Sequence, residues 1–139
     1  MSATKTFIDT NVLIYAFDVR SAAKQKVAEA ALDELWSNRT GVLSVQVLQE
    51  FYVNVTRKIG KPLTKDAARE IVGLYSSWCG ETSSAEIESA FRIEIESRVG
   101  FWDALILASA VKAGATRILS EDMNAGQVIS GVRIENPFI

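Results

Sequence analysis

The sequence predicts an α/β protein in which a mostly parallel sheet is flanked by helices. Short β-prone runs alternate with longer segments whose apolar residues recur at the helical spacing, and this alternation is typical of parallel strands joined by helical crossovers. The chain has 139 residues, of which 48% are hydrophobic, and only two prolines. A chain of this length typically buries about two thirds of its unfolded surface. We therefore expect one globular domain spanning residues 1–139.

The order of the expected elements follows from local signals. Ser21 and Thr64 are good N-caps, the SSAE run at 83–86 is a capping box, and Gly60 with Pro62 breaks a helix. Strands are expected at 6–8, 41–44, 116–120 and 132–139, with a very short one at 79–82. Helices are expected at 11–17, 21–38, 47–60, 65–78, 84–97 and 102–114, with a turn or short helix at 121–126. The helix at 102–114 is apolar nearly all round, so we expect it to be buried on most faces.

The residue types present restrict the chemistry that this chain can perform. It has no histidine and one cysteine, Cys79, which excludes Ser-His-Asp triads, intramolecular disulfides and zinc sites built from His or several Cys. The 15 Lys and Arg against 17 Asp and Glu give a net charge of -2, so any contact with nucleic acid must be local. Neither a signal peptide nor a run of roughly 18 apolar residues is evident. We expect a cytoplasmic protein in which carboxylates perform any catalysis.

Four carboxylates are candidates for that role. Asp9 and Asp122 each follow a predicted strand, and the carboxyl ends of neighbouring parallel strands lie at the same edge of a sheet. Asp103 falls in the first turn of the apolar helix, where a charge without a partner would be unfavourable. Each has a structural alternative, because Asp9 is also a helix cap, Asp122 a turn residue and Asp103 favourable beside the helix dipole. Glu50 lies opposite the apolar face of its helix, which by itself favours a solvated side chain.

Converging carboxylates would require compensating positive charge. Two unit charges about 4 Å apart repel by roughly 4 kcal/mol at an effective dielectric constant near 20. Since the chain offers only oxygen ligands in quantity, Mg²⁺ or Mn²⁺ is favoured over zinc or copper. The chemistry suited to such a site is metal-assisted hydrolysis of a phosphodiester. Thr10, Asn11 and Ser120 could orient the metal ligands or donate to the substrate, although each is equally suited to capping the backbone.

Four stretches of the sequence resemble the acidic motifs of a known family, in the same order. They are FIDTNVLIYAF, LSVQVLQEFYVNV, GFWDALILASAVKAGA and ILSEDMNAG. Together they resemble PIN domains, and more narrowly the VapC-type toxin nucleases of bacterial toxin-antitoxin pairs, over essentially the whole chain. The resemblance implies a PIN-like three-layer α/β sandwich with a mostly parallel five-stranded sheet flanked by helices. It also implies cleavage of single-stranded RNA, a homodimer, and inhibition by a small antitoxin whose tail occupies the active-site groove.

The resemblance further implies roles for individual residues. Four carboxylates would form the Mg²⁺ or Mn²⁺ site with two hydroxyls in support: Asp9, Glu50, Asp103 and Asp122, with Thr10 and Ser120. Glu50 thereby acquires a role that its position on the helix does not predict. Glu121 adjoins Asp122, and either acid could approach a second metal; we expect Asp122 to do so.

Residues that contact RNA are harder to identify from the sequence. The candidates are five basic residues near the second and third motifs: Arg57, Lys58, Lys61, Arg92 and Arg98. For any one of them taken alone, a solvated surface residue is the better explanation. Trp36, Trp78 and Trp102 are expected in the core or at a dimer contact rather than as platforms for base stacking.

Three other functions fit the sequence less well than a nuclease. A haloacid-dehalogenase-type phosphatase would need an acid where Asn11 stands, and a response-regulator receiver would need paired acids after the first strand and a late lysine. The remaining alternative is a catalytically inactive PIN-like module that binds RNA or a partner protein. Because all four acids are present, we rank this module second.

Overall fold

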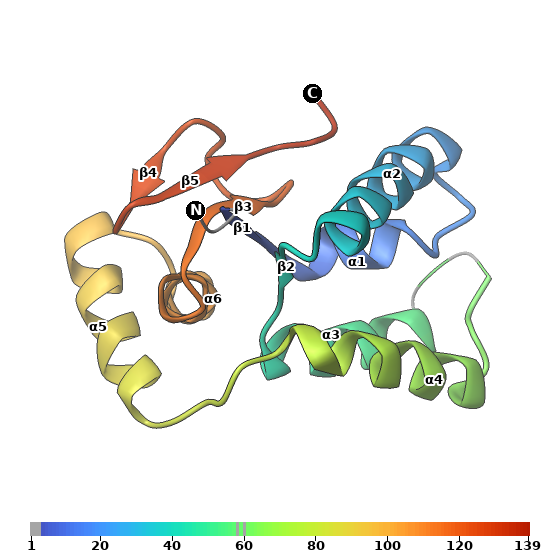
Figure 1. Cartoon of the computed structure of the whole chain (residues 1–139), viewed down its shortest axis with the longest axis horizontal. Coiled ribbons are helices and arrows are strands. Elements are labelled where there is room, and N and C mark those ends of the chain that lie inside the picture. Colours follow the sequence, from blue (N-terminus) through green and yellow to red (C-terminus); the bar gives the residue numbers. More distant parts are fainter. Residues whose placement is uncertain (1–3, 58, 60) are drawn as a thin grey trace.

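The computed structural model describes residues 4–57, 59 and 61–139. Within these residues, five strands form one sheet in the order β2-β1-β3-β5-β4 (Figure 1). The strands are β1 Lys5–Ile8, β2 Gly41–Val42, β3 Ala115–Leu119, β4 Val128–Ile129 and β5 Val132–Glu135. The pairs β1/β2, β1/β3 and β3/β5 are parallel, and β4/β5 is antiparallel. The predicted mostly parallel α/β sheet is confirmed.

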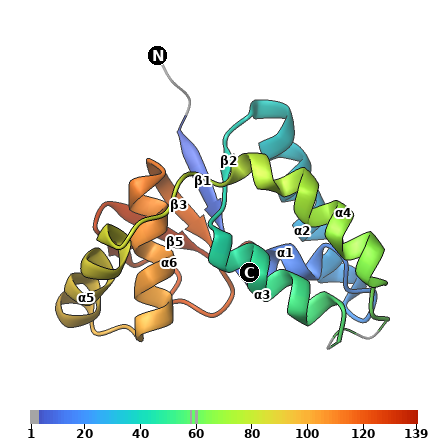
Figure 2. The same cartoon turned by 90° about the horizontal axis from the view of Figure 1, so that it is seen from below.

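Helices flank this sheet on both sides. They are α1 Thr10–Tyr15, α2 Ala22–Asn38, α3 Val45–Val55, α4 Lys65–Tyr75, the 3₁₀ helix η1 Ser76–Trp78, α5 Ala85–Ser97 and α6 Phe101–Lys112. Figures 1 and 2 show α5 and α6 together on one side of the molecule and α1 to α4 on the other. Helix α6 packs against β3 and β5, whereas α2 packs against β2 and α1 contacts α3. The core therefore lies between the sheet and these helices, with Phe7, Phe51 and Leu107 fully buried in it.

Most of the predicted helix starts are confirmed. The Thr64 hydroxyl accepts a hydrogen bond from the Ala67 amide at 3.1 Å, as an N-cap does. Ser21 occupies the N-cap position of α2, but its side chain makes no capping hydrogen bond there. In the predicted capping box, the Glu86 carboxylate accepts a hydrogen bond from the Ser83 amide at 2.8 Å.

The strands and short helices differ from the prediction in four points. The closing strand ends at Glu135 rather than 139, because the Asn136 side chain accepts a 2.9 Å hydrogen bond from the Phe138 amide and turns the chain. The strand expected at 79–82 is reduced to one bridge between Cys79 and Leu43. Strand β4 was not predicted, because two residues are too few to display an alternating pattern. The helix predicted at 11–17 begins at Thr10 and ends at Tyr15.

Two further features concern exposure. The first turn of α6 was expected to be buried, yet Trp102 is 67% exposed and Asp103 is exposed beside it, because α5 covers only part of this helix. Trp36 is also partly exposed, whereas Trp78 is in the core as expected. None of the helices in the described residues is both long and apolar enough to span a membrane.

Candidate active site

The site is built where β1 and β3 end side by side. Ile8 and Leu119, the last residues of these strands, are paired in the parallel register, and the Asp9 amide donates a 3.0 Å hydrogen bond to the Leu119 carbonyl. The chain leaves both strands at the same edge of the sheet, which is where ligands bind in open α/β sheets. Asp9 and Ser120 are therefore neighbours in space although 111 residues separate them.

A cavity of about 240 Å³ opens at this edge. It is lined by residues from α1, α3, α6 and the two strand ends: Asp9, Thr10, Asn11, Ile14, Gln46, Glu50, Asn54, Trp102, Asp103, Ile106 and Asp122. The structure thus brings all four predicted carboxylates to one cavity from four different segments of the chain. Ser120 does not line the cavity but is fully buried directly behind it.

Asp9 is the most buried of the four acids, with 8% of its surface exposed. Its carboxylate accepts hydrogen bonds from the Thr10 amide at 2.8 Å and from the Ser120 hydroxyl at 2.7 Å. Burial raises the pKa of Asp9 from 3.8 to about 6, and the negative charges of Asp103 and Glu50 add to this rise while the two hydrogen bonds oppose it. Asp9 is consequently both the cap of α1 and a carboxylate of the cavity.

Glu50 is not the solvated side chain that its helical face suggests. The Thr10 hydroxyl donates to Glu50 Oε2 at 3.0 Å, and the Gln46 side-chain amide donates to Glu50 Oε1 at 2.8 Å. The contact with Thr10 exists because α1 packs across the polar face of α3, whereas Gln46 lies one turn before Glu50 on α3 itself. The helical periodicity of α3 identifies that face as polar but cannot indicate that another helix covers it.

Asp103 and Asp122 complete the acidic lining at its exposed rim. Partial desolvation raises the pKa of Asp103, and the nearby charges of Asp122 and Glu50 raise it further. Asp122 is held by Asn11, whose side-chain amide donates to Asp122 Oδ2 at 3.0 Å and to Asp9 Oδ2 at 3.4 Å. Asn11 therefore connects two acids that belong to different strand ends.

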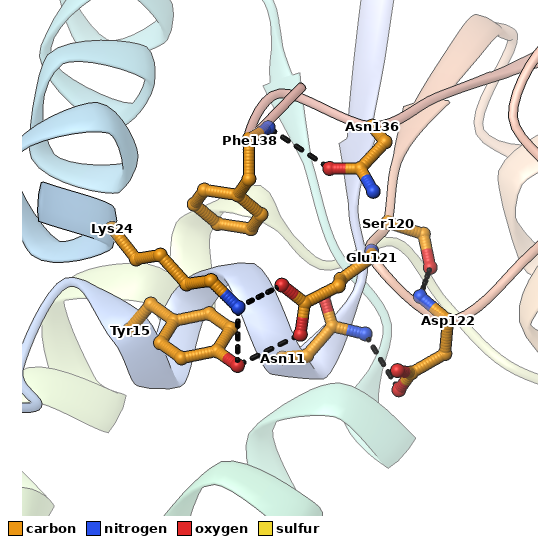
Figure 3. Close-up of polar contacts among 8 residues, drawn as sticks. All are labelled: Asn11, Tyr15, Lys24, Ser120, Glu121, Asp122, Asn136 and Phe138. Carbon is orange, nitrogen blue, oxygen red and sulfur yellow. Dashed lines mark hydrogen bonds and ion pairs between the residues drawn. The ribbon is translucent and has the colours of Figure 1, made fainter. Parts of the chain in front are cut away.

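Glu121 is directed away from the cavity. Its carboxylate accepts a 2.7 Å hydrogen bond from the Tyr15 hydroxyl and forms an ion pair with Lys24 of α2 (Figure 3). The Lys24 ammonium lies 4.7 Å from the centre of the Tyr15 ring and 5.6 Å from that of Phe138. The hydrogen bond from Lys24 is the main cause of the lowered pKa of Glu121. With Glu121 committed to these partners, Asp122 is the acid of this loop that lines the cavity.

The side chains around the cavity supply several oxygen acceptors. Four carboxylates line it, and so does Gln46, whose buried Oε1 has no hydrogen-bond partner among the described residues. The described part of the chain contains no group of three or more acidic, His or Cys side chains already gathered closely enough to hold a metal ion. Four carboxylates together with an amide oxygen that lacks a partner are the kind of oxygen ligands that suit a hard divalent cation.

The predicted RNA-contact residues lie elsewhere on the molecule. Arg57, Lys61, Arg92 and Arg98 are exposed, and none of them lines the acidic cavity; Lys58 lies outside the described residues. A neighbouring cavity of about 270 Å³ does contain a basic residue, Arg20. Neither Arg20 nor Trp102 was singled out from the sequence for this site, because no local pattern links them to the acids.

The fold and this cavity define an α/β protein with an acidic site at the carboxyl edge of a parallel sheet. Residues 6–128 match the PIN domain family, and the chain therefore belongs to that family. No curated protein matches the sequence.

Several solved structures share the fold. A toxin-antitoxin complex from Klebsiella pneumoniae has a TM-score of 0.68 and 19% identity over 92% of this chain and 95% of that chain. VapBC2 from Rickettsia felis, bound to a DNA fragment from their promoter, has a TM-score of 0.66 and 18% identity over 96% of this chain and 98% of that chain. VapC20 from Mycobacterium tuberculosis, described as a sarcin-ricin loop cleaving toxin, has a TM-score of 0.59 and 19% identity over 85% of this chain and 90% of that chain.

Proposed function

We propose that this PIN domain is a Mg²⁺- or Mn²⁺-dependent endoribonuclease that cleaves single-stranded RNA. The observation that carries the proposal is the arrival of Asp9, Glu50, Asp103 and Asp122 at one cavity from four separate segments. An acidic lining of this kind repels a phosphodiester unless divalent cations neutralise it. When bound, such a cation would activate water and stabilise the charge that develops on the phosphate.

The residues around the cavity would have two roles, binding the cation and orienting the carboxylates that bind it. Asp9, Glu50, Asp103 and Asp122 would hold the cation. Asn11 and Ser120 would keep the Asp9 and Asp122 carboxylates oriented through the hydrogen bonds described above, and Thr10 would do the same for Glu50. The raised pKa of Asp9, about 6, means that binding of a cation must compete with a proton on this carboxyl at mildly acidic pH.

We further propose that the nuclease is the toxin of a toxin-antitoxin pair, acting in the cytoplasm as a homodimer with a small protein antitoxin. Support comes from solved complexes that share its fold, including one described as a toxin-antitoxin complex and another bound to promoter DNA. A further neighbour is described as a sarcin-ricin loop cleaving toxin, which agrees with an RNA substrate. Co-expression with the product of a short reading frame next to its gene should yield a complex that no longer cleaves RNA, and a complex that retains full cleavage would contradict inhibition.

The nuclease proposal is tested with purified chain, free of any antitoxin, and a mixed set of single-stranded RNA oligonucleotides. Cleavage should require Mg²⁺ or Mn²⁺ and should be abolished by Asp9→Asn or Asp103→Asn. Asp66→Asn is the matched control, because Asp66 is exposed on α4 and pairs with Arg69 far from the cavity lining. Calorimetric titration of Mn²⁺ gives an independent readout, with binding to wild type and to Asp66→Asn but weakened binding to Asp103→Asn.

The opposite result has a defined meaning. If pure wild type stays inert with both metals across varied RNAs while still binding RNA or a protein, the chain is an inactive PIN-like binding module.

A further inference from the structure

We propose that Trp102 is a stacking platform for an unpaired base of the substrate, next to the phosphodiester held in the acidic cavity. The inference rests on the proposed ribonuclease function and adds to it a subsite for one nucleobase. It reverses the sequence-based expectation that Trp102 belongs to the core or to a dimer contact.

The position of Trp102 is the first observation. Its side chain lines the acidic cavity next to Asp103, yet 67% of its surface is exposed. Tryptophan is usually well buried, because its large apolar surface is unfavourable in water. A largely exposed indole at the rim of a polar cavity is therefore available to a flat, apolar group of a ligand.

The ring is also held in place from behind. Phe101 contacts Trp102 edge-on, with ring centres 5.2 Å apart and an interplanar angle of 73°. Phe101 in turn contacts Phe91 of α5, with ring centres 5.8 Å apart. This row of aromatic side chains ties Trp102 to α5, so the indole is supported by α5 as well as by its own helix and loses less freedom when a base stacks on it.

The cavities indicate a path for a single strand. The acidic cavity shares Asn11, Ile14 and Asn54 with the neighbouring cavity that contains Arg20. Trp102 belongs only to the first cavity and Arg20 only to the second. A strand that passes the four carboxylates can thus meet the Trp102 ring in the first cavity and, in the second, the exposed guanidinium of Arg20, which is ion-paired with Asp18. Aromatic rings together with basic groups are what single-stranded nucleic acid binds.

A second copy of the chain is the competing occupant of this surface. Ile87, Phe91 and Ile95 are exposed and recur every four residues on α5, so they form an apolar row that a partner could cover. Trp102 differs from this row because it lines the cavity with the acids, whereas none of the three does. This continuity with the cavity favours a base over a protein partner.

The test removes one base at a time from the RNA. Single abasic sites are walked across an oligonucleotide around its cleavage position, and binding is measured in the Asp9→Asn background so that the strand stays intact. One abasic position should weaken binding by roughly 5- to 150-fold, the equivalent of about 1 to 3 kcal/mol for one stacked base. Adding Trp102→Ala should abolish this position-specific loss, and Trp102→Phe should retain part of it.

Two controls separate the possible outcomes. Trp36→Phe, in the Trp36–Tyr75–Trp78 aromatic cluster that does not line the cavity, should leave the abasic profile unchanged. Sedimentation should show the same oligomeric state for all variants. An abasic profile that Trp102→Ala leaves intact would overturn the inference while wild-type cleavage upholds the nuclease. A changed oligomeric state with uniformly weaker binding would overturn it in favour of a second copy. Absence of RNA binding and cleavage by wild type would remove the proposed function and the inference together.

Discussion

The hydroxyl of Ser120 donates a 2.7 Å hydrogen bond to Oδ2 of Asp9, joining the ends of β3 and β1. The hydroxyl oxygen of Ser120 in turn accepts hydrogen bonds from the Asp122 and Met123 amides, both at 3.3 Å. One buried serine therefore orients the Asp9 carboxylate and shapes the turn that carries Asp122. This explains how two acids that are distant in the sequence keep a fixed relation to each other.

Replacing Ser120 with alanine should raise the pKa of Asp9 further, because the hydrogen bond from Ser120 holds it down against the effect of burial. If cleavage needs ionised Asp9, the acidic limb of the pH–rate profile should move to higher pH. The loss of buried hydrogen bonds should also lower the free energy of unfolding by about 1 to 3 kcal/mol. The exposed Ser37→Ala serves as control, and an unchanged pH profile for Ser120→Ala would contradict the role assigned to this hydroxyl.

Asp9 should make the metal-free protein less stable as the pH rises. Its pKa is 3.8 in the unfolded chain and about 6 in the folded protein, so the unfolded chain releases this proton first between these pH values. The free energy of unfolding then falls across that window by up to about 3 kcal/mol. Asp9→Asn should be more stable than wild type at pH 7 in EDTA, with the difference shrinking toward pH 4. Urea unfolding at several pH values measures the free energy of unfolding of both proteins. A difference between them that stays constant with pH would refute the prediction.

Lys24 should affect cleavage although it lies outside the cavity. Lys24→Ala removes the ion pair that holds Glu121 away from the acids, and thereby loosens the loop that carries Asp122. We expect cleavage to fall by about 10-fold, as is common when a group that orients a metal ligand is lost. Because the pair is partly exposed, stability should change by only about 1 kcal/mol or less. Lys26→Ala, on the exposed face of the same helix, is the control, and equal activities of the two variants would argue against the positioning role.

Two glycines should respond in opposite ways to alanine. A Cβ at Gly41 would overlap the ring of Trp78, so Gly41→Ala should lower the free energy of unfolding by about 1 to 3 kcal/mol. Gly73 is exposed within α4 and has open space around it, so Gly73→Ala should raise that free energy by about 0.5 to 1 kcal/mol. Thermal unfolding of the two variants tests the pair, and a destabilised Gly73→Ala would contradict the open space around Gly73.

Much of the fold could be predicted because its signals are local. The apolar periodicity of α3, the Thr64 cap and the β-prone run of β3 are properties of a few consecutive residues. Strand β4 was not predicted, because two residues are too few to show an alternation of apolar and polar side chains. Its pairing with β5 also depends on the turn between the two strands.

The same distinction between local and long-range signals applies to the residues of the candidate site. Asp9 and Asp122 could be proposed from strand ends, because parallel strands deliver their carboxyl ends to one edge of a sheet. The placement of Glu50 depends on α1 packing across α3, and the choice between Glu121 and Asp122 depends on Lys24 of α2. Such contacts join residues about 40 and 97 positions apart, which no local pattern records.

The amino-acid sequence by itself determined the fold class, the lack of histidine chemistry and the set of acids available for a metal, because these follow from composition and short-range periodicity. Only the tertiary structure decided which acids face one cavity, which acid is neutralised by a lysine instead, and that Trp102 stands exposed at the rim. The physical reason is that burial, hydrogen bonding and charge pairing depend on distances in space, and these are set when helices from separate parts of the chain pack around the strand ends.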